Sequence, residues 1–182
     1  MQTIKSDKPV NVPVVGLAAW SGTGKTSLLV NLIRLFRKRK LRTGVIKHAH
    51  HDFEIDYPGK DSYELRKAGS GQVLLVSANR WALMGEDAGD GEPELPVLLR
   101  RMALDDLDLV LVEGFRHIPF PKIELHRPDL GKPLLCAGDD SIIAVATDGT
   151  IASPPELPIF DLNDPPAIAA FIRQYCERFN GA

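Results

Sequence analysis

The sequence has no long apolar run and little net charge. Its 182 residues carry a formal net charge of −2, and no stretch approaches the roughly 20 apolar residues of a membrane-spanning helix. The first residues, MQTIKSDKPVN, lack the apolar segment of a signal peptide. A nearly neutral chain also offers no electrostatic footprint for nucleic acid or an anionic membrane. We therefore expect a cytoplasmic protein that binds neither nucleic acid nor membranes.

Cysteine is scarce as well. The two cysteines, Cys136 and Cys176, lie far apart and form no CxxC pair. This excludes a disulfide-rich scaffold and a cysteine-based zinc site. We expect two buried, reduced thiols.

Short apolar runs alternate with amphipathic segments along the chain. The runs at 12–19, 43–49, 106–114 and 142–149 are typical of strands buried on both faces. Segments 25–40, 61–70, 96–104 and 164–180 favour helices, and 72–78 with 80–85 favour a hairpin. We expect Asp61 and Asp164 to cap their helices and Gly69 to end one.

This alternation predicts an α/β fold, a three-layer sandwich with a mostly parallel central sheet. We expect residues 1–10 to be a flexible leader, residues 11–182 to form a single nucleotide-binding domain, and the acidic stretch 85–94 to be a mobile surface loop. Ligands of such sheets bind beyond the carboxyl ends of the strands, where three of the expected strands end in polar groups.

The stretch AAWSGTGKTS, residues 18–27, follows the first expected strand and opens the first helix. It matches the phosphate-binding pattern Gly-x4-Gly-Lys-Ser/Thr except that Ala19 replaces the first glycine. A small residue suffices there if its φ stays negative, whereas Gly22 and Gly24 supply the permissive backbone that lets N–H groups converge on an anion. The match predicts the fold of a P-loop NTPase; the alternative is a glycine-rich turn that binds nothing.

Each residue type in the loop has a chemical role. Lys25 would neutralise the β and γ phosphates, and the Thr26 hydroxyl would bind Mg²⁺. The N–H groups at the helix start point their dipole at the phosphates. The expected phosphate-binding residues are Ser21, Gly22, Thr23, Gly24, Lys25, Thr26 and Ser27.

Two acids follow expected strands. Glu113 stands where a second acid would hold Mg²⁺ with Thr26 or orient a water, and we assign catalysis to Lys25 and Glu113. Asp148, after Thr147, is a candidate for recognising guanine, because a carboxylate accepts two hydrogen bonds from N1 and N2. The alternatives are a solvated strand-end acid and a simple turn residue. Asp108 begins its strand, at the opposite edge.

The second expected strand runs into IKHAHHD, which holds Lys47, His48, His50, His51 and Asp52. Three interpretations stay open: a loop that closes on the γ-phosphate or on a partner, a zinc or nickel site, and a solvated polar loop. We include Lys47, His48 and Asp52 among the nucleotide-binding candidates.

Taken in order, AAWSGTGKTS, VIKHAHHD, PGKDSYELRKAGS, RWALM and DLVLVEGFRH resemble the MobB family of molybdopterin-guanine dinucleotide biosynthesis proteins. The resemblance implies a dimeric GTP-binding protein with weak GTPase activity that uses Mg²⁺. It also implies that the protein assists the guanylyltransferase that attaches GMP to molybdopterin, and that it carries GTP, molybdopterin or both. The resemblance makes Asp148 a stronger candidate for recognising guanine, although the Asn-Lys-x-Asp signature of many GTPases is absent.

Other functions remain as alternatives. A small-molecule kinase would use the same loop but needs an arginine-rich lid, which the segments 52–60 and 85–94 do not offer. A metallochaperone would carry its metal on the histidine stretch. A nucleotide-binding module without turnover would differ only in the absence of phosphate release.

Overall fold

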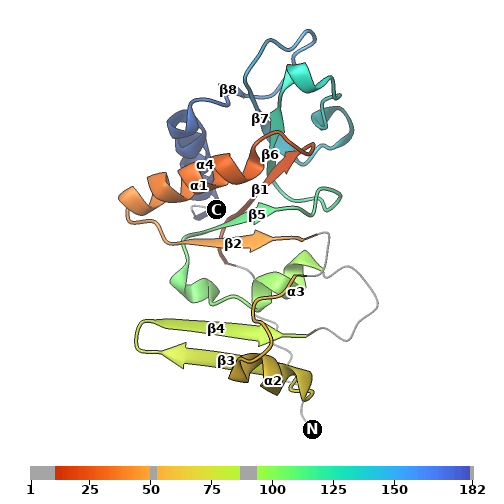
Figure 1. Ribbon diagram of the computed structural model, residues 1–182. Helices are drawn as coiled ribbons and strands as arrows, with labels where there is room; N and C mark the ends of the chain where they lie inside the picture. Colours follow the sequence, from red (N-terminus) through yellow and green to blue (C-terminus); the bar gives the residue numbers. More distant parts are fainter. Residues whose placement is uncertain (1–10, 50–52, 87–93, 181–182) are drawn as a thin grey trace. The chain divides into compact units, whose positions relative to one another are not determined.

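A six-stranded sheet lies at the centre of the computed structural model, which describes residues 11–49, 53–86 and 94–180 (Figure 1). Its strand order is β2-β5-β1-β6-β7-β8, and every neighbouring pair is parallel. The strands are β1 (Val14–Ala19), β2 (Thr43–Lys47), β5 (Leu109–Glu113), β6 (Lys122–His126), β7 (Ile142–Thr147) and β8 (Ile159–Asp161). The expected parallel α/β sheet is confirmed.

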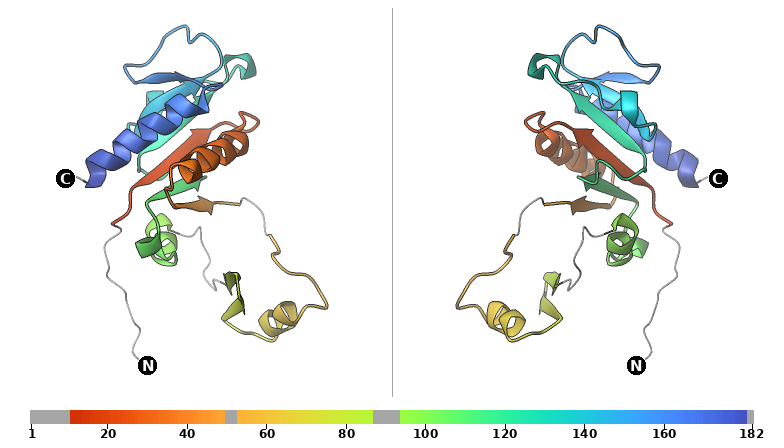
Figure 2. Two further views of the ribbon diagram at one scale, coloured as in Figure 1. Left: turned by 90° about the vertical axis from the view of Figure 1, so that its left-hand side faces the viewer. Right: turned by 90° about the vertical axis from the view of Figure 1, so that its right-hand side faces the viewer.

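Helices cover both faces of this sheet. α1 (Lys25–Lys38) and α4 (Pro165–Asn180) lie on one face (Figure 2), where their leucines and isoleucines pack on Leu109 and Leu111 of β5. The short helix α3 (Leu95–Arg100) packs with Val110 and Val112, which alternate to the other face. This is the predicted three-layer arrangement, with one thin layer.

The ends of α1 and α4 follow local rules. Gly24 precedes α1 in the left-handed region, and Arg37 and Lys38 stand in its last turn, where cations favour the helix dipole. Asp164 caps α4 as expected, because its Oδ1 accepts a hydrogen bond from the N–H of Ala167 at 3.2 Å. In the described part of the chain, no helix is long and apolar enough to cross a membrane.

Strand β6 was not expected from the sequence. Its residues KIELH alternate apolar and charged side chains, which suggests a half-exposed segment, yet all five are buried. Lys122 forms an ion pair with Asp139 at 2.9 Å, and Glu124 accepts hydrogen bonds from the N–H groups of Leu135 and Cys136. Strand β8, only three residues long at the sheet edge, was also missed.

Three short 3₁₀ turns complete the first compact unit. Two of them, η2 (Pro128–Leu130) and η3 (Cys136–Gly138), lie between β6 and β7, and a third, η1 (Leu104–Asp106), precedes β5.

The two cysteines have raised pKa values. Burial raises the pKa of Cys136 to about 11, and it raises the pKa of Cys176 to about 11 as well. Both thiols are free and partly buried, which keeps them protonated at neutral pH.

The chain divides into two compact units, Met1–His48 with Pro93–Ala182 and Ala49–Glu92. The second unit contains α2 (Asp61–Lys67) and the predicted antiparallel hairpin of β3 (Gln72–Ser77) and β4 (Arg80–Gly85). The expectation of a single domain over 11–182 stays a prediction. The leader 1–10 and most of the acidic stretch, residues 87–93, lie outside the described residues.

One expected cap in this second unit is wrong. Asp61 is the first residue of α2, and the capping position belongs to Lys60, whose backbone is extended and whose side chain makes no capping bond. Asp61 instead supplies negative charge in the first turn, where the helix dipole favours it. Gly69 ends the helix as expected, with φ of 97° and its N–H donating to Arg66 O at 3.0 Å.

Candidate functional site

The carboxyl ends of β1, β2 and β5 meet at one edge of the central sheet. Lys47 at the end of β2 pairs in register with Glu113 at the end of β5, and β1 lies on the other side of β5. The turn after β1 leads directly into α1. Three of the predicted site segments therefore come together where a parallel sheet binds its ligands.

The backbone of the turn has the conformation that an anion-binding loop needs. Gly22 and Gly24 have φ of 82° and 93°, which strains any residue with a Cβ. Ala19 is the last residue of β1, and it is not among the described residues that have a positive φ. Gly24 offers α1 no capping side chain, so the first N–H groups of the helix remain available to a ligand.

Side chains stabilise this turn from inside. The buried Thr23 hydroxyl donates a hydrogen bond to Trp20 O at 2.8 Å, so only the backbone of Thr23 is left to contact a ligand. Lys25 Nζ donates to Ala19 O at 3.3 Å and to Trp20 O at 3.2 Å. The ammonium is thus held at the mouth of the loop.

The electrostatic surroundings of Lys25 are cationic. Partial burial lowers its pKa; Glu113 opposes this effect, and the charges of Arg116 and Lys47 add to it. Burial and neighbouring cations disfavour the charged form of Lys25, so an anionic ligand bound beside it would stabilise that charged form.

Thr26 and Glu113 form the pair that the sequence predicted for a metal. Thr26 Oγ1 lies 3.4 Å from each carboxylate oxygen of Glu113. Lys47 Nζ approaches the same carboxylate at 3.8 Å, and the Glu113 side chain is only 10% exposed. A hydroxyl and a carboxylate facing each other beside the loop are the oxygen donors that Mg²⁺ prefers.

The histidine segment is fixed at its start by the backbone after β5. His48 N–H donates to Glu113 O at 2.8 Å, and the His48 ring stacks on Phe115 with centroids 4.8 Å apart. Gly114 has φ of 107°, and a Cβ there would lie 2.5 Å from His48 Cβ. The two segments therefore pack too closely for any other residue at position 114.

His50, His51 and Asp52 lie outside the described residues. In the ranges that the structure describes, no group of three or more His, Cys, Asp or Glu residues could hold a metal ion. The roles expected for the histidine stretch therefore stay predictions.

Asp148 lies at the end of β7, next to Thr147, and is linked to the loop through a residue that sequence reasoning missed. Arg127, directly after β6, donates from Nε to Thr23 O at 2.9 Å and from Nη1 to Asp148 Oδ2 in an ion pair. The Thr147 hydroxyl donates to Gly149 O at 3.1 Å. The sequence did not predict a role for Arg127, because it did not predict the strand that positions this residue.

Two further cations near the loop were also missed. The guanidinium of Arg116 lies 4.8 Å from the centre of the Trp20 ring, and Lys132 Nζ lies 5.8 Å from it. The only available signal was the motif VEGFRH, in which Arg116 follows Glu113 by three residues.

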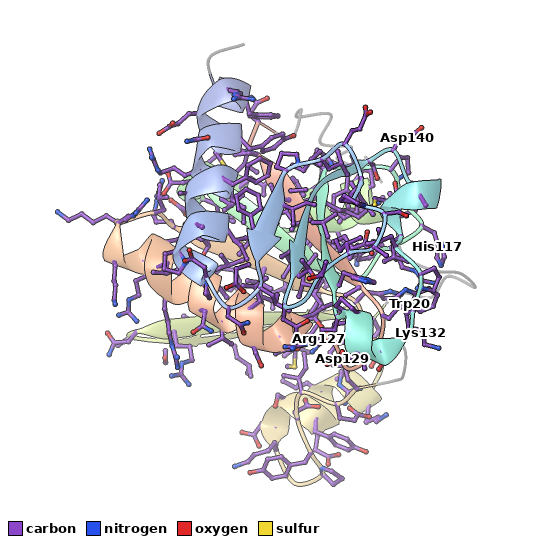
Figure 3. The ribbon with its side chains drawn as sticks, turned by 90° about the horizontal axis from the view of Figure 1, so that it is seen from above. Trp20, His117, Arg127, Asp129, Lys132 and Asp140 are labelled. Carbon is purple, nitrogen blue, oxygen red and sulfur yellow. The ribbon has the colours of Figure 1, made fainter. Side chains whose placement is uncertain are left out.

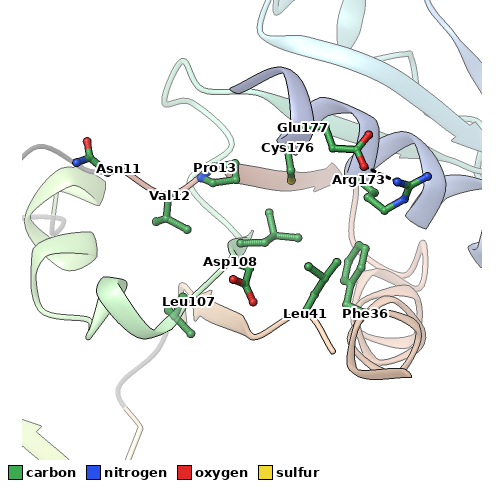
Figure 4. A pocket seen from close by; sticks show the side chains of 11 residues that line it. Asn11, Val12, Pro13, Phe36, Leu41, Leu107, Asp108, Arg173, Cys176 and Glu177 are labelled. Carbon is green, nitrogen blue, oxygen red and sulfur yellow. Dashed lines mark hydrogen bonds and ion pairs between the residues drawn. The ribbon is translucent and has the colours of Figure 1, made fainter. Parts of the chain in front are cut away.

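A pocket of about 290 Å³ lies at the opposite, amino-terminal edge of the sheet (Figure 4). It is lined by apolar residues just before β1, at the start of β5 and on α1, together with Asp108 and with Arg173, Cys176 and Glu177 of α4. Asp108 is bonded to the N–H of Arg42 at 2.7 Å, which agrees with its expected place away from the phosphate loop.

Comparisons with known proteins show the family of this chain. Residues 14–148 match the family model described as molybdopterin guanine dinucleotide synthesis protein B, MobB. The chain is 45% identical to the molybdopterin-guanine dinucleotide biosynthesis adapter protein of Escherichia coli strain K12, over 93% of this chain and 97% of that protein. It is 41% identical to the adapter protein of the same name from Haemophilus influenzae, over 94% of this chain and 93% of that protein.

Solved structures agree with the fold. A crystal structure of molybdopterin-guanine biosynthesis protein B superposes with a TM-score of 0.72 at 24% identity, and the match covers 90% of this chain and 99% of that one.

Proposed function

The chain belongs to the MobB family of molybdopterin-guanine dinucleotide biosynthesis adapter proteins, and from this premise we propose that it binds GTP and Mg²⁺ in the assembly of the molybdenum cofactor. The observation that carries the proposal is the turn between β1 and α1. There two glycines in positive φ, Lys25 and the Thr26–Glu113 pair lie at the carboxyl edge of a parallel sheet.

The phosphates are held mainly by the backbone of the turn. Gly22 has open space where a Cβ would stand, and Gly24 meets only the tip of the Arg127 side chain there, at 3.5 Å. The turn therefore leaves room for a chain of phosphates against the N–H groups of residues 21–27. Lys25 exchanges its two carbonyl partners for phosphate oxygens and gains charge-assisted hydrogen bonds.

The metal donors fit Mg²⁺. Bound Mg²⁺ would neutralise charge on the β and γ phosphates. Thr26 Oγ1 and the Glu113 carboxylate would hold it, because both present oxygen atoms beside the loop and Glu113 is already aligned at 3.4 Å from the hydroxyl. Lys47 Nζ lies 3.8 Å from the same carboxylate.

Hydrolysis by this arrangement would be slow. Glu113 is engaged by Thr26 and Lys47, so it is poorly placed to take a proton from an attacking water. His48 is held against Phe115, and we assign it with Asp52 to sensing the γ-phosphate rather than to proton transfer. We therefore propose that the protein is at most a weak GTPase.

The base would lie toward the end of β7. Thr147 and Asp148 stand there, and Asp148 is tied by Arg127 to the carbonyl of Thr23. Guanine offers two adjacent donors, N1–H and N2–H, that suit a carboxylate. We therefore propose that Asp148 recognises guanine.

The family membership also suggests the setting. We propose that the protein acts in the cytoplasm as a homodimer and delivers GTP, molybdopterin or both to the guanylyltransferase that joins them. The adapter names of the relatives support this role.

Calorimetry with GTP, GDP, ATP and ADP in the presence and absence of Mg²⁺ tests the nucleotide proposal. We expect tighter binding of the guanine nucleotides and a loss of affinity for GTP when Mg²⁺ is removed. Equal affinity for guanine and adenine nucleotides would refute the assignment of the base site. Transfer of the γ-phosphate to a metabolite instead of water would identify a kinase.

Capture experiments test the adapter role. The full chain immobilised with and without GTP is expected to retain a purified molybdopterin guanylyltransferase in a nucleotide-dependent manner. If the guanylyltransferase is retained neither with nor without GTP, the adapter role is refuted and only the proposed nucleotide site stands.

A further inference from the structure

Two cations, Arg116 and Lys132, gather on the indole ring of Trp20 beside the phosphate loop. Their charged groups lie 4.8 Å and 5.8 Å from the ring centre. The three residues come from three separate segments: the turn after β1, the loop after β5 and the loop between η2 and η3. Figure 3 shows Trp20 and Lys132 together at the right of the view.

The ring that carries these cations is fixed. Trp20 Nε1 donates a hydrogen bond to Pro133 O at 2.9 Å, which ties the indole to the residue after Lys132. Its backbone is fixed as well, since Trp20 O accepts bonds from Thr23 and Lys25. The cluster of Trp20, Arg116 and Lys132 therefore borders the phosphate loop with a defined geometry.

Among the residues that the structure describes, these two cations have no acidic partner, whereas other cations do. Lys122 pairs with Asp139, and Arg127 pairs with Asp148. Within the ranges that the structure describes, neither Arg116 nor Lys132 forms an ion pair with a carboxylate. The nearby acid, Glu113, is already engaged by Thr26 and Lys47.

The excess positive charge adjoins the phosphate loop but is not part of it. Lys25 lies inside the loop, and Lys47 contacts Glu113, so both are accounted for by a nucleotide with its metal. Arg116 and Lys132 lie instead over the side chain of Trp20, and the charge of Arg116 repels that of Lys25. An anion bound at the cluster would relieve this repulsion.

We propose that Trp20, Arg116 and Lys132 form a second anion subsite, which binds the phosphate monoester of a phosphorylated small molecule next to the nucleotide. A monoester carries a charge of about −1.5 to −2 at neutral pH and three acceptor oxygens, which matches two cations. The guanidinium can bind two of these oxygens at once, and the ammonium adds a point charge. The position beside the nucleotide rests on the proposed function; the phosphate chemistry of the cluster does not.

Titration of phenyl phosphate into the full chain tests this subsite. The phosphate loop is first saturated with Mg²⁺ and guanosine 5′-(β,γ-imido)triphosphate, so that the probe cannot enter it. The double variant R116A/K132A is expected to bind phenyl phosphate at least about 10-fold more weakly than the unchanged chain, since each cation supplies a charge-assisted contact. Its affinity for the GTP analogue is expected to fall by a smaller factor, because the charge of Arg116 also acts on Lys25 although neither cation lies inside the loop.

Two controls make the result specific. The variant R37A/K38A removes the same charge from the exposed last turn of α1 and is expected to bind phenyl phosphate normally. Phenyl sulfate, which carries a single charge, is expected to bind the unchanged chain more weakly than phenyl phosphate.

Three outcomes would overturn the subsite. The first is that the unchanged chain does not bind phenyl phosphate. The second is that R116A/K132A binds phenyl phosphate as tightly as the unchanged chain does. The third is that R116A/K132A loses affinity for the GTP analogue but keeps its affinity for GDP. The last result would assign the two cations to the nucleotide's own terminal phosphate. Repeating the titration without nucleotide separates the two proposals, because a chain that binds phenyl phosphate through the cluster but no nucleotide refutes only the proposed function.

Discussion

At the scale of single residues, Lys25 makes the most direct contribution to the proposed site. Its ammonium is held at the mouth of the loop by two carbonyl oxygens, and burial lowers its pKa. Lys25→Ala removes a charge-assisted contact of about 1.5–3 kcal/mol. We expect calorimetry to show GTP binding weakened by roughly 10- to 150-fold. Lys38→Ala, at the far end of the same helix, is the matched control, and equal affinity in both variants would place the nucleotide elsewhere.

Asp148 can read guanine or merely orient Arg127, and one substitution separates these roles. An asparagine at 148 offers one acceptor and one donor, which suits xanthine rather than guanine. If Asp148 contacts the base, Asp148→Asn weakens GDP binding by roughly 10- to 150-fold and improves XDP binding. If Asp148 only orients Arg127, GDP, XDP and ADP all lose affinity by the same factor. Competition binding of the three diphosphates measures the difference.

At the scale of elements, β6 is held in the sheet by charge rather than by apolar side chains alone. Asp139 accepts hydrogen bonds from Lys122 Nζ at 2.9 Å and from Ser141 N–H at 3.0 Å. Burial would raise the pKa of Asp139, but the bonds from Ser141 and Lys122 outweigh it and hold the pKa below its ordinary value. Lys122 is 1% exposed, so losing its partner leaves a buried charge.

Asp139→Asn is therefore expected to destabilise the protein by about 3 kcal/mol at neutral pH. Because the pKa of Asp139 is depressed on folding, its contribution is full above about pH 4 and is lost as the pH falls further. Urea unfolding from pH 7 to pH 3 measures this, and the variant is expected to lose less stability over that range than the unchanged chain. The double variant K122M/D139N should cost less than the two single variants together. An additive result would mean that the pair is not coupled.

The same strand shows where sequence reasoning reached its limit. The runs that became β1, β5 and β7 were recognised because strands buried on both faces are almost wholly apolar. The pattern of β6 gives no such signal, because Lys122 and Glu124 become buried only once Asp139 and the N–H groups near η3 pair with them. Arg127, which follows β6, was missed for the same reason. Local motifs predicted the glycine turn between β1 and α1, whereas contacts between distant segments could not be predicted.

At the scale of the whole molecule, ligand binding and folding are linked. A ligand that binds only the folded state at 100 times its Kd adds about 2.7 kcal/mol to the free energy of unfolding. For a chain of 182 residues, this corresponds to a rise in Tm of roughly 5–11 °C. We expect Mg²⁺ and GDP to produce such a rise in the unchanged chain and a much smaller one in Lys25→Ala at the same concentrations. Differential scanning fluorimetry measures both.

The two tryptophans extend this experiment to the organisation of the chain, because Trp20 and Trp81 stand in different compact units. In Trp81→Phe the fluorescence reports on Trp20, and in Trp20→Phe it reports on Trp81, which is 62% exposed. If residues 11–182 form one cooperative domain, both variants melt in a single transition at similar temperatures, and Mg²⁺ with GDP raises both transitions equally. If the unit Ala49–Glu92 unfolds by itself, the Trp81 fluorescence shows a separate transition whose temperature does not change with Mg²⁺ and GDP. A ligand raises the melting temperature only of the cooperative unit that binds it.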